Sequence, residues 1–353
     1  MVDSTIANAG GISRSDWTSD EFKIISGANA AANGLSAPYP SPGDSTMDEI
    51  VRGLSGRQKK LPSKLFYDER GSQLFDDICN LSEYYVTRTE TALMESYADE
   101  IAAELGARAM LIEYGSGSST KTRVLLSHLD RPAGYVPIDI SAEHLIKTVR
   151  ALKREYPGLE IHPLAADFTR PFALPASVNG SFSENPNRVI YFSGSTIGNF
   201  EKHEATDLMR GMASIVKKGG RLLIGVDLDK DPEVLQRAYD DSLGVTAEFN
   251  RNILVRLNRE FGCNFDVDQF EHRAIYDAQH SRVEMHLVSL VPQTATVCGK
   301  TVTFEIGETI LTEYSHKYTI STFTEIAEQA GFQSRRVWMD PEELFSIHLL
   351  EVA

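Results

Sequence analysis

The sequence is poor in the features that mark secreted, membrane-bound and nucleic-acid-binding proteins. Its three cysteines are odd in number, far apart and without the spacing of a metal site, so no disulfide framework is expected: Cys79, Cys263 and Cys298. No apolar run approaches the roughly 20 residues of a membrane-spanning helix, and the N-terminus lacks the basic and apolar regions of a secretory signal. The net charge of −15 argues against nucleic acid or an anionic membrane as the partner. We therefore expect a cytoplasmic protein.

Metal-binding patterns are also missing, and the remaining composition is that of a globular protein. The nine histidines form no HxH or HExxH pattern, so we expect no catalytic metal. Hydrophobic residues make up 42% of the chain and charged residues 24%, within the range of ordinary globular proteins. A chain of 353 residues is long enough for two domains or one large one.

Local patterns divide the chain into a tail and two kinds of structure. Residues 1–45 are rich in Ala, Gly, Ser and Pro, so we expect a flexible tail there. Over residues 90–229, short apolar runs alternate with amphipathic helical patterns, which predicts βαβ crossovers and a mostly parallel α/β sheet. Helical and then strand-like patterns over 230–315 predict an inserted α+β domain, after which the sheet domain resumes near residue 316.

The most informative stretch is a tight glycine turn after a short apolar run. Residues 110–112 end a predicted strand, and Glu113, Gly115 and Gly117 follow before a helical pattern begins near Thr120. A strand, turn and helix N-terminus in this order can hold a nucleotide-like cofactor against bare backbone. The missing third glycine and the acidic Glu113 favour the cationic S-adenosylmethionine over a dinucleotide pyrophosphate. A lone GxG also leaves open an ordinary βα turn or a weak dinucleotide fingerprint.

Acidic residues at the ends of the next strands strengthen the cofactor interpretation. Asp139 ends the strand after the glycine turn, where a carboxylate can accept both ribose hydroxyls. Asp167 and Phe168 end the third strand, where the carboxylate can accept the adenine amine and the ring can cover the base. Alone, each could be a solvated strand end, a helix cap or a core aromatic. Three carboxylates at successive strand ends predict a ligand site at that edge of the sheet.

Two further segments carry polar groups for a substrate. The GSTIGN turn over 194–199 follows the fourth strand, and the Asn199 amide can donate to a carboxylate. In an extended segment over 311–318, Glu313 and Ser315 project to the same face and could bind a polar heterocycle with N–H donors. Taken alone, the first segment is better interpreted as a glycine-rich turn with a capping Asn, and the second as a solvated strand face.

Together, the motifs resemble those of the L-histidine Nα-methyltransferases of ergothioneine biosynthesis. The resemblance runs from about residue 61 to the C-terminus and leaves out the tail. It is carried by long and unusual stretches: FYDxxGS (66–72), EYYxTRTE (83–90), GSGxSxKTR (115–123), GSTIGN (194–199), AYDDxxGVTAxFNRN (238–252) and LTExSxK (311–317).

The resemblance implies a fold, an activity and a division of the chain. It implies an α/β protein with a class I, Rossmann-like methyltransferase sheet and an inserted α+β substrate-binding domain. S-adenosylmethionine would be the co-substrate, and the α-amine of L-histidine would be methylated up to the trimethylated betaine, hercynine. The substrate-binding domain would comprise 46–89 plus 230–315, and the cofactor-binding domain 90–229 plus 316–353. We expect a monomer without nucleic acid or membrane partners.

The resemblance also implies a role for individual residues. Residues that match the cofactor site of the family are Gly115, Lys121, Asp139, Asp167 and Phe168. Residues that match the substrate site hold the carboxylate (Asn199, Tyr239), recognise the imidazole (Tyr84, Glu313, Ser315), line the side-chain pocket (Met285) or lie near the reacting amine (Tyr67, the candidate catalytic residue).

Three alternative functions remain at this point. The first is an N-methyltransferase of another aromatic amino acid such as tryptophan, against which Glu313 and Ser315 argue. The second is a binding protein that keeps the fold without catalysis, which the complete set of cofactor and substrate residues disfavours. The third is a nicotinamide oxidoreductase, against which Glu113 and Thr120 count.

Overall fold

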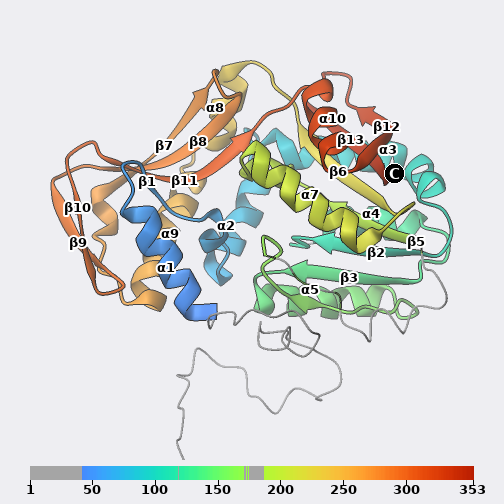
Figure 1. The fold of residues 1–353 in the computed structure, drawn as a ribbon, viewed down its shortest axis with the longest axis horizontal. Helices are drawn as coiled ribbons and strands as arrows, with labels where there is room; N and C mark the ends of the chain where they lie inside the picture. Colours follow the sequence, from blue (N-terminus) through green and yellow to red (C-terminus); the bar gives the residue numbers. More distant parts are fainter. Residues whose placement is uncertain (1–41, 118, 171, 173, 175–186) are drawn as a thin grey trace, which may run out of the picture.

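The elements of the chain gather around two separate sheets (Figure 1). The computed structural model describes residues 42–117, 119–170, 172, 174 and 187–353. One sheet has seven strands and the other has four, and a two-stranded hairpin lies at the outer end of the latter.

All strands of the seven-stranded sheet run in the same direction except one, β13. Its order is β12-β13-β6-β5-β2-β3-β4, and β13 runs antiparallel to both of its neighbours. The strands are β2 (Ala109–Tyr114), β3 (Gly134–Asp139), β4 (Leu164–Ala165), β5 (Asn187–Phe192), β6 (Arg221–Asp227), β12 (Phe332–Met339) and β13 (Phe345–Val352). After β2 the chain adds β3 and β4 on one side of β2 and then returns to place β5 and β6 on the other side. In sheets with such a reversal, ligands bind in the crevice at the carboxyl ends of the two strands where the order changes, here β2 and β5.

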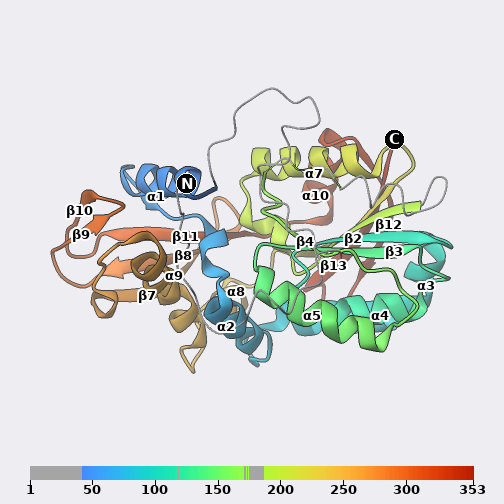
Figure 2. The same ribbon diagram turned by 90° about the horizontal axis from the view of Figure 1, so that it is seen from below.

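Helices cover both faces of this sheet, and each face has its own hydrophobic core. In β2, Leu111 belongs to one core, whereas Met110 and Ile112 belong to the other, because successive side chains of a strand point to opposite faces. Figure 2 shows helices on both sides of the sheet. Above lie α7 (Lys202–Val216) and α10 (Ile320–Gln329), and below lie α3 (Tyr85–Leu105), α4 (Thr120–His128) and α5 (Ala142–Glu155).

The four-stranded sheet and its helices form the other half of the molecule (Figure 1). The order of its strands is β1-β11-β8-β7. They are β1 (Lys59–Lys60), β7 (Phe270–Asp277), β8 (Arg282–Ser289) and β11 (Thr309–His316), and the outer hairpin is β9 (Gln293–Val297) and β10 (Lys300–Phe304). The other elements of this half, including two short 3-10 helices, are α1 (Pro42–Leu54), η3 (Ser63–Phe66), α2 (Glu69–Cys79), α8 (Pro232–Tyr239), α9 (Val245–Phe261) and η5 (Val267–Gln269).

A β-bulge in β11 shapes the face that this sheet turns inward. The register of β11 against β8 shifts between Leu311 and Glu313, so Thr312 is left between two paired residues. The Thr312 hydroxyl donates to Asn250 Oδ1 at 2.7 Å, which ties the bulge to α9. Beyond the bulge, Glu313 lies opposite Met285 of β8.

The predicted alternation of strands and helices is confirmed, with differences at the ends of elements. Helix α1 begins at Pro42, so the expected tail of residues 1–45 is too long by its last residues, and residues 1–41 lie outside the described part. The third strand, expected to end at Asp167 and Phe168, is only Leu164–Ala165, with an isolated bridge at Ile161. The strand-like patterns of the insertion account for β7, β8 and β10, whereas β9 of the outer hairpin was missed.

Candidate active site

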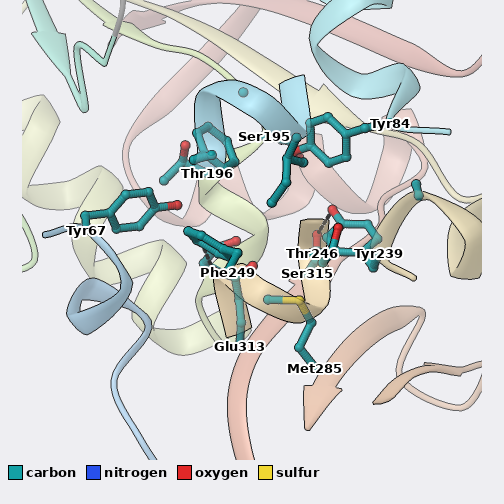
Figure 3. A pocket seen from close by; sticks show the side chains of 15 residues that line it. Tyr67, Tyr84, Ser195, Thr196, Tyr239, Thr246, Phe249, Met285, Glu313 and Ser315 are labelled. Carbon is teal, nitrogen blue, oxygen red and sulfur yellow. Dashed lines mark hydrogen bonds between the residues drawn. The ribbon is translucent and has the colours of Figure 1, made fainter. Parts of the chain in front are cut away.

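One pocket collects side chains from both halves of the molecule. It opens to solvent and is lined by Tyr67, Phe75, Ile78, Tyr84, Gly194, Ser195, Thr196, Asn199, Ala238, Tyr239, Thr246, Phe249, Met285, Glu313 and Ser315. In Figure 3, the Tyr67 hydroxyl points inward from one side, with Tyr239 and Ser315 together on the other. Every residue predicted for the substrate site or for catalysis lines this pocket.

The predicted residues reach the pocket from distant parts of the sequence. Tyr67 directly follows η3, and Tyr84 precedes the first residue of α3. Asn199 ends the short helix η4 (Thr196–Asn199), which follows β5 at the sheet edge. Tyr239 ends α8, whereas Met285, Glu313 and Ser315 come from the neighbouring strands β8 and β11. Only the folded chain brings these groups together.

Glu313 is a buried carboxyl group with one polar neighbour among the predicted residues. The Asn199 amide donates to Glu313 Oε2 at 3.2 Å. Burial raises the pKa of Glu313 to about 8, against the opposing effect of the Lys317 charge. The group therefore holds a proton at neutral pH in the empty pocket, and a cationic or N–H-donating ligand would favour its ionised form.

A fully buried lysine stands behind the opposite wall of the pocket. Lys317 Nζ donates to Tyr239 Oη at 2.9 Å, to Ser315 Oγ at 2.7 Å and to Asp227 Oδ2 at 2.7 Å. The two hydroxyl oxygens of Tyr239 and Ser315 are 2.7 Å apart. Burial opposes the charge of the ammonium group, but Asp227 raises the pKa of Lys317, so it stays protonated. The wall is thus a hydroxyl pair held by a cation.

Aromatic rings form the rest of the pocket. Tyr67 makes edge contacts with Phe75 and Phe249 at centroid distances of 5.8 and 6.0 Å, and Tyr84 meets Tyr239 at 6.0 Å. Burial, and then the charge of Glu313, raises the pKa of Tyr67 well above its ordinary value. Tyr67 is therefore a neutral phenol at physiological pH, able to donate or accept a hydrogen bond but not to act as a phenolate base.

Sequence reasoning missed several residues of this site. Phe75, Thr196 and Phe249 line the pocket, and Lys317 and Asp227 support its wall. A signal existed for three of them, because Thr196 lies in the GSTIGN stretch, Phe249 lies in the AYDDxxGVTAxFNRN stretch and Lys317 ends the LTExSxK stretch. The roles of the others depend on tertiary contacts that no local pattern contains.

The glycine turn has the geometry of a cofactor cradle. Gly115 and Gly117 both adopt positive φ values, +70° and +45°, which glycine reaches without steric cost. The backbone N–H of Gly115 donates to Ile138 O at 2.8 Å, which fixes the turn to β3. A Cβ built on Gly117 would meet nothing within 4 Å, so the backbone there lies open to a ligand. These residues fit a nucleotide-like cofactor.

Asp139, at the end of β3, hydrogen-bonds to the backbone beside the glycine turn. Its Oδ2 accepts from Gly117 N at 3.1 Å, and its Oδ1 accepts from Ser141 N at 2.9 Å. Burial raises the pKa of Asp139, and these backbone hydrogen bonds oppose the shift. Because each carboxylate oxygen can accept more than one hydrogen bond, both remain able to accept from a diol.

Glu113 has internal partners in place of the direct contact with the cofactor that was expected. It is almost fully buried and accepts from the hydroxyls of Thr122, at 2.7 and 2.8 Å, and of Tyr135. Burial raises the pKa of Glu113 to about 7. The carboxyl group therefore ties β2 to α4 and β3 beneath the glycine turn, which is a supporting position rather than a binding surface.

Lys121 is held by an acidic partner that sequence reasoning overlooked. Its ammonium group forms an ion pair with the fully buried Glu90 of α3. The same Glu90 oxygen accepts from Gly194 N at 2.8 Å. Glu90 thereby joins the start of α4 to the turn after β5, the two segments that flank the crevice of the sheet.

Asp167 and Phe168 occupy the neighbouring stretch of the same edge. Asp167 Oδ2 accepts from Lys64 Nζ at 3.0 Å, which connects the sheet edge to η3. Burial opposes ionisation, but hydrogen bonds from Thr169 and the charge of Lys64 lower the pKa of Asp167. Phe168 packs on Tyr114 at a centroid distance of 5.5 Å and borders Gly115. Both residues are placed to face a base beside the glycine turn.

The described residues contain neither a cluster of metal ligands nor a membrane-spanning helix. Within them, no group of three or more His, Cys, Asp or Glu side chains is arranged to hold a metal ion. No helix in that part of the chain combines the length and the apolar character needed to cross a bilayer.

The fold and the cradle define the class of protein. A central β2 flanked by β3 and β5, a reversed β13 between β6 and the edge strand β12, and a glycine turn after β2 are the plan of a class I, S-adenosylmethionine-dependent methyltransferase. Among solved structures, the chain shows a distant similarity to the 1,6-didemethyltoxoflavin-N1-methyltransferase of Burkholderia thailandensis, with a TM-score of 0.42 and 10% identity over 90% of this chain and 93% of that one.

The chain belongs to the histidine-specific, S-adenosylmethionine-dependent methyltransferase family, which matches residues 46–352. Histidine N-alpha-methyltransferase of Mycolicibacterium smegmatis is 38% identical over 306 residues, covering 85% of this chain and 93% of the relative. The Mycobacterium tuberculosis protein of the same name is equally similar. Ergothioneine biosynthesis protein 1 of Schizosaccharomyces pombe is 30% identical over 78% of this chain, which matches 36% of that longer protein.

Proposed function

We propose that this enzyme transfers methyl groups from S-adenosylmethionine to the α-amine of L-histidine, up to hercynine, in the first step toward ergothioneine. The observation that carries the proposal is the convergence of Tyr67, Tyr84, Asn199, Tyr239, Met285, Glu313 and Ser315 on one pocket. Relatives named for histidine methylation and for ergothioneine biosynthesis support it.

In this proposal histidine is held at both ends. Asn199 and Tyr239 hold its carboxylate, whereas Glu313 and Ser315 hold its ring. The Asn199 amide has two N–H groups, so it can keep its hydrogen bond to Glu313 and donate to the substrate carboxylate as well. Tyr84 and Met285 fill the space around the ring. With both ends fixed, the amine has one direction left, toward the crevice of the sheet.

The cofactor site supplies the other half of the reaction. S-adenosylmethionine, when bound, provides a methyl group on a positively charged sulfur. The turn at Gly115 and Gly117 would receive its methionine part, with Lys121 available to the carboxylate. Asp139 would accept the ribose hydroxyls. Asp167 and Phe168 would recognise the adenine, and Glu113 would keep the turn in place from below.

Positioning accounts for most of the expected acceleration. Methyl transfer needs a neutral amine whose lone pair lies in line with the carbon–sulfur bond, and such alignment can supply roughly 7–11 kcal/mol. Tyr67, as a neutral phenol, can accept a hydrogen from the amine and so orient its lone pair. As methyl groups replace hydrogens on the nitrogen, the site needs apolar walls more than polar ones, which Phe75 and Phe249 provide.

We also propose the division of the chain that the resemblance implies. Residues 46–89 with 230–315 would form the substrate-binding domain, and residues 90–229 with 316–353 the cofactor-binding domain. The separate four-stranded and seven-stranded sheets support this division. We further propose a monomer that acts in the cytoplasm and needs no metal, nucleic acid or membrane.

The second candidate function is N-methylation of another aromatic amino acid such as tryptophan. An L-tryptophan methyltransferase of Psilocybe serbica is 25% identical over 82% of this chain. Glu313 and Ser315 favour histidine, because an indole ring cannot satisfy both polar groups and would leave a buried carboxyl group unpaired.

Mass spectrometry of the reaction products tests the proposal. Purified protein, S-adenosylmethionine and L-histidine should give mono-, di- and trimethylhistidine in succession, with the trimethyl form remaining at completion. Tryptophan and tyrosine should react far more slowly. An end point at the monomethyl form would contradict the formation of hercynine, and faster methylation of tryptophan would contradict the choice of substrate.

A further inference from the structure

The hydrogen bonds of Lys317 restrict what the opposite wall of the pocket can offer a ligand. We call Lys317, Tyr239 and Ser315 the lysine wall. An ammonium group has three N–H donors and no acceptor. Lys317 uses these donors on Asp227, Tyr239 and Ser315, at 2.7–2.9 Å, and its side chain has no exposed surface. The lysine therefore acts on the pocket only through the two hydroxyls.

The hydroxyl pair can give a single hydrogen to a ligand. Tyr239 Oη and Ser315 Oγ each accept one hydrogen from Lys317. At a separation of 2.7 Å, one of these hydroxyls must donate to the other. The donating hydroxyl has no second hydrogen, so only its partner keeps an O–H for the pocket. If a ligand accepts a hydrogen bond from Tyr239, the Ser315 hydroxyl must therefore be the one that donates to Tyr239.

A substrate carboxylate decides which of the two hydroxyls donates to the other. This step rests on the proposed function, in which Tyr239 contacts the carboxylate of the amino acid. Because a carboxylate only accepts hydrogen bonds, it fixes the direction of the hydrogen bond between Tyr239 and Ser315. Tyr239 must donate to the carboxylate, and Ser315 must donate to Tyr239. Toward the ring of the substrate, Ser315 then presents only a lone pair. Glu313, as a carboxylate that already accepts from Asn199, also presents lone pairs.

A ring held between these two acceptors must donate at both nitrogens. We infer that the pocket binds the histidine side chain as an imidazolium cation, whose ring N–H groups donate to Ser315 and Glu313, and that Lys317 is the positioning residue that imposes this state. Neutral imidazole has one N–H donor and one acceptor nitrogen, so it could satisfy both groups only if Glu313 kept its proton, which the Lys317 charge and the hydrogen bond from Asn199 oppose.

The proton for the ring is already in the pocket. Glu313 is protonated in the empty site at neutral pH, since burial raises its pKa to about 8. When neutral histidine binds, the Glu313 O–H bond breaks and a ring N–H bond forms, so a neutral pair becomes an ion pair without a proton from solvent. The titratable groups with which Glu313 interacts are Lys317, Tyr67 and Tyr84. Both tyrosines stay neutral, so Lys317 is the charge that opposes a proton on Glu313.

An isostere of histidine with a weakly basic ring tests the inference. In triazolylalanine, a ring nitrogen replaces one carbon, and the ring stays neutral at neutral pH with a single N–H. Calorimetry would measure the dissociation constants of histidine and triazolylalanine in the presence of S-adenosylhomocysteine. The wild-type protein should prefer histidine by about 10- to 100-fold, the range of a hydrogen bond to a charged group.

Variants of the two lysines around Asp227 separate the role of Lys317 from general electrostatics. Lys317→Met frees the hydroxyl pair from the lysine, so Ser315 can donate to a neutral ring and the preference should fall below about 3-fold. Lys230→Met is the matched control, because Lys230 also donates to Asp227, at 2.7 Å, but none of its hydrogen bonds goes to Tyr239 or Ser315. It should keep the wild-type preference.

Each result bears on one of the two claims. Equal binding of the two ligands by the wild-type protein would overturn the imidazolium assignment, even if histidine is methylated. An unchanged preference in Lys317→Met, or the same loss in Lys230→Met, would overturn the role of Lys317. If Lys317→Met does not fold, Ser315→Ala removes the same acceptor and should lower the preference in its place. Absence of both binding and methylation of histidine in the wild type would instead contradict the proposed function.

Discussion

Replacement of Glu313 by alanine should change the substrate preference of the enzyme without unfolding it. Glu313 is buried, faces the ring site and is the only carboxyl group among the residues that line the described pocket. Its loss removes a charged hydrogen bond to the ring, which contributes about 1.5–3 kcal/mol. The KM for histidine should therefore rise by about 10- to 150-fold.

The same change should leave the stability of the protein unchanged or higher. Burial raises the pKa of Glu313 above its ordinary value of 4.5, so the folded state disfavours the charged form. This destabilising contribution grows as the pH rises from the ordinary value to about 8, and the alanine variant lacks it. A thermal melt at alkaline pH should accordingly show a Tm for the variant at or above that of the wild type.

Steady-state kinetics with several amino acids would measure the effect. Removal of the carboxyl group also frees space beside Met285, so tryptophan and phenylalanine should gain in kcat/KM relative to histidine. Glu313→Gln is the matched control, because it keeps the volume and one acceptor oxygen, and it should lose less affinity for histidine than the alanine variant. An unchanged KM for histidine in a folded Glu313→Ala protein would refute the assignment of the ring site.

Three other substitutions test the cofactor side of the crevice. Asp139→Ala should raise the KM for S-adenosylmethionine by about 10- to 100-fold, while Asp139→Asn loses less, as initial rates at varied cofactor would measure. Lys121→Met leaves the buried Glu90 without its cation, so denaturant unfolding should show that the free energy of unfolding falls by about 3–5 kcal/mol. A second change, Glu90→Gln, should largely restore the stability. A single variant as stable as the wild type would contradict the burial argument. Glu113 binds its proton more tightly in the folded protein than in the unfolded chain, so its ionisation should lower the Tm of the wild type between pH 4.5 and about 7. Glu113→Gln should remove this fall in Tm. A fall of the same size in the variant would contradict this account.

The parallel sheet could be predicted because its signals are local. Each buried strand is a short apolar run with a helical pattern after it, and crossover rules then leave few topologies. Strand β9 of the outer hairpin was missed, since it is short and alternates exposed polar and buried residues, which is a weak signal on its own. The bulge at Thr312 depends on pairing with β8 and a hydrogen bond to Asn250, which no reading of β11 alone could contain.

The residues of the site that lie in recognisable motifs could be predicted, whereas the direction in which a side chain points could not. The substrate residues were expected from the motifs, and the pocket collects them. Glu113 was expected to face the cofactor, yet its place on the buried strand β2 turns it toward Thr122 and Tyr135. Glu90 and Lys317 were not assigned a role, because a charged residue is normally exposed and only the fold shows that both are buried with partners.

The central claim is that one cavity holds histidine by its ring and its carboxylate so that its amine faces the methyl donor. A crystal structure with L-histidine and S-adenosylhomocysteine bound together tests it most directly. The account predicts the ring between Glu313 and Ser315, the carboxylate at Asn199 and Tyr239, and the amine nitrogen directed at the sulfur. Histidine bound away from Glu313, or with its amine turned from the sulfur, would contradict it.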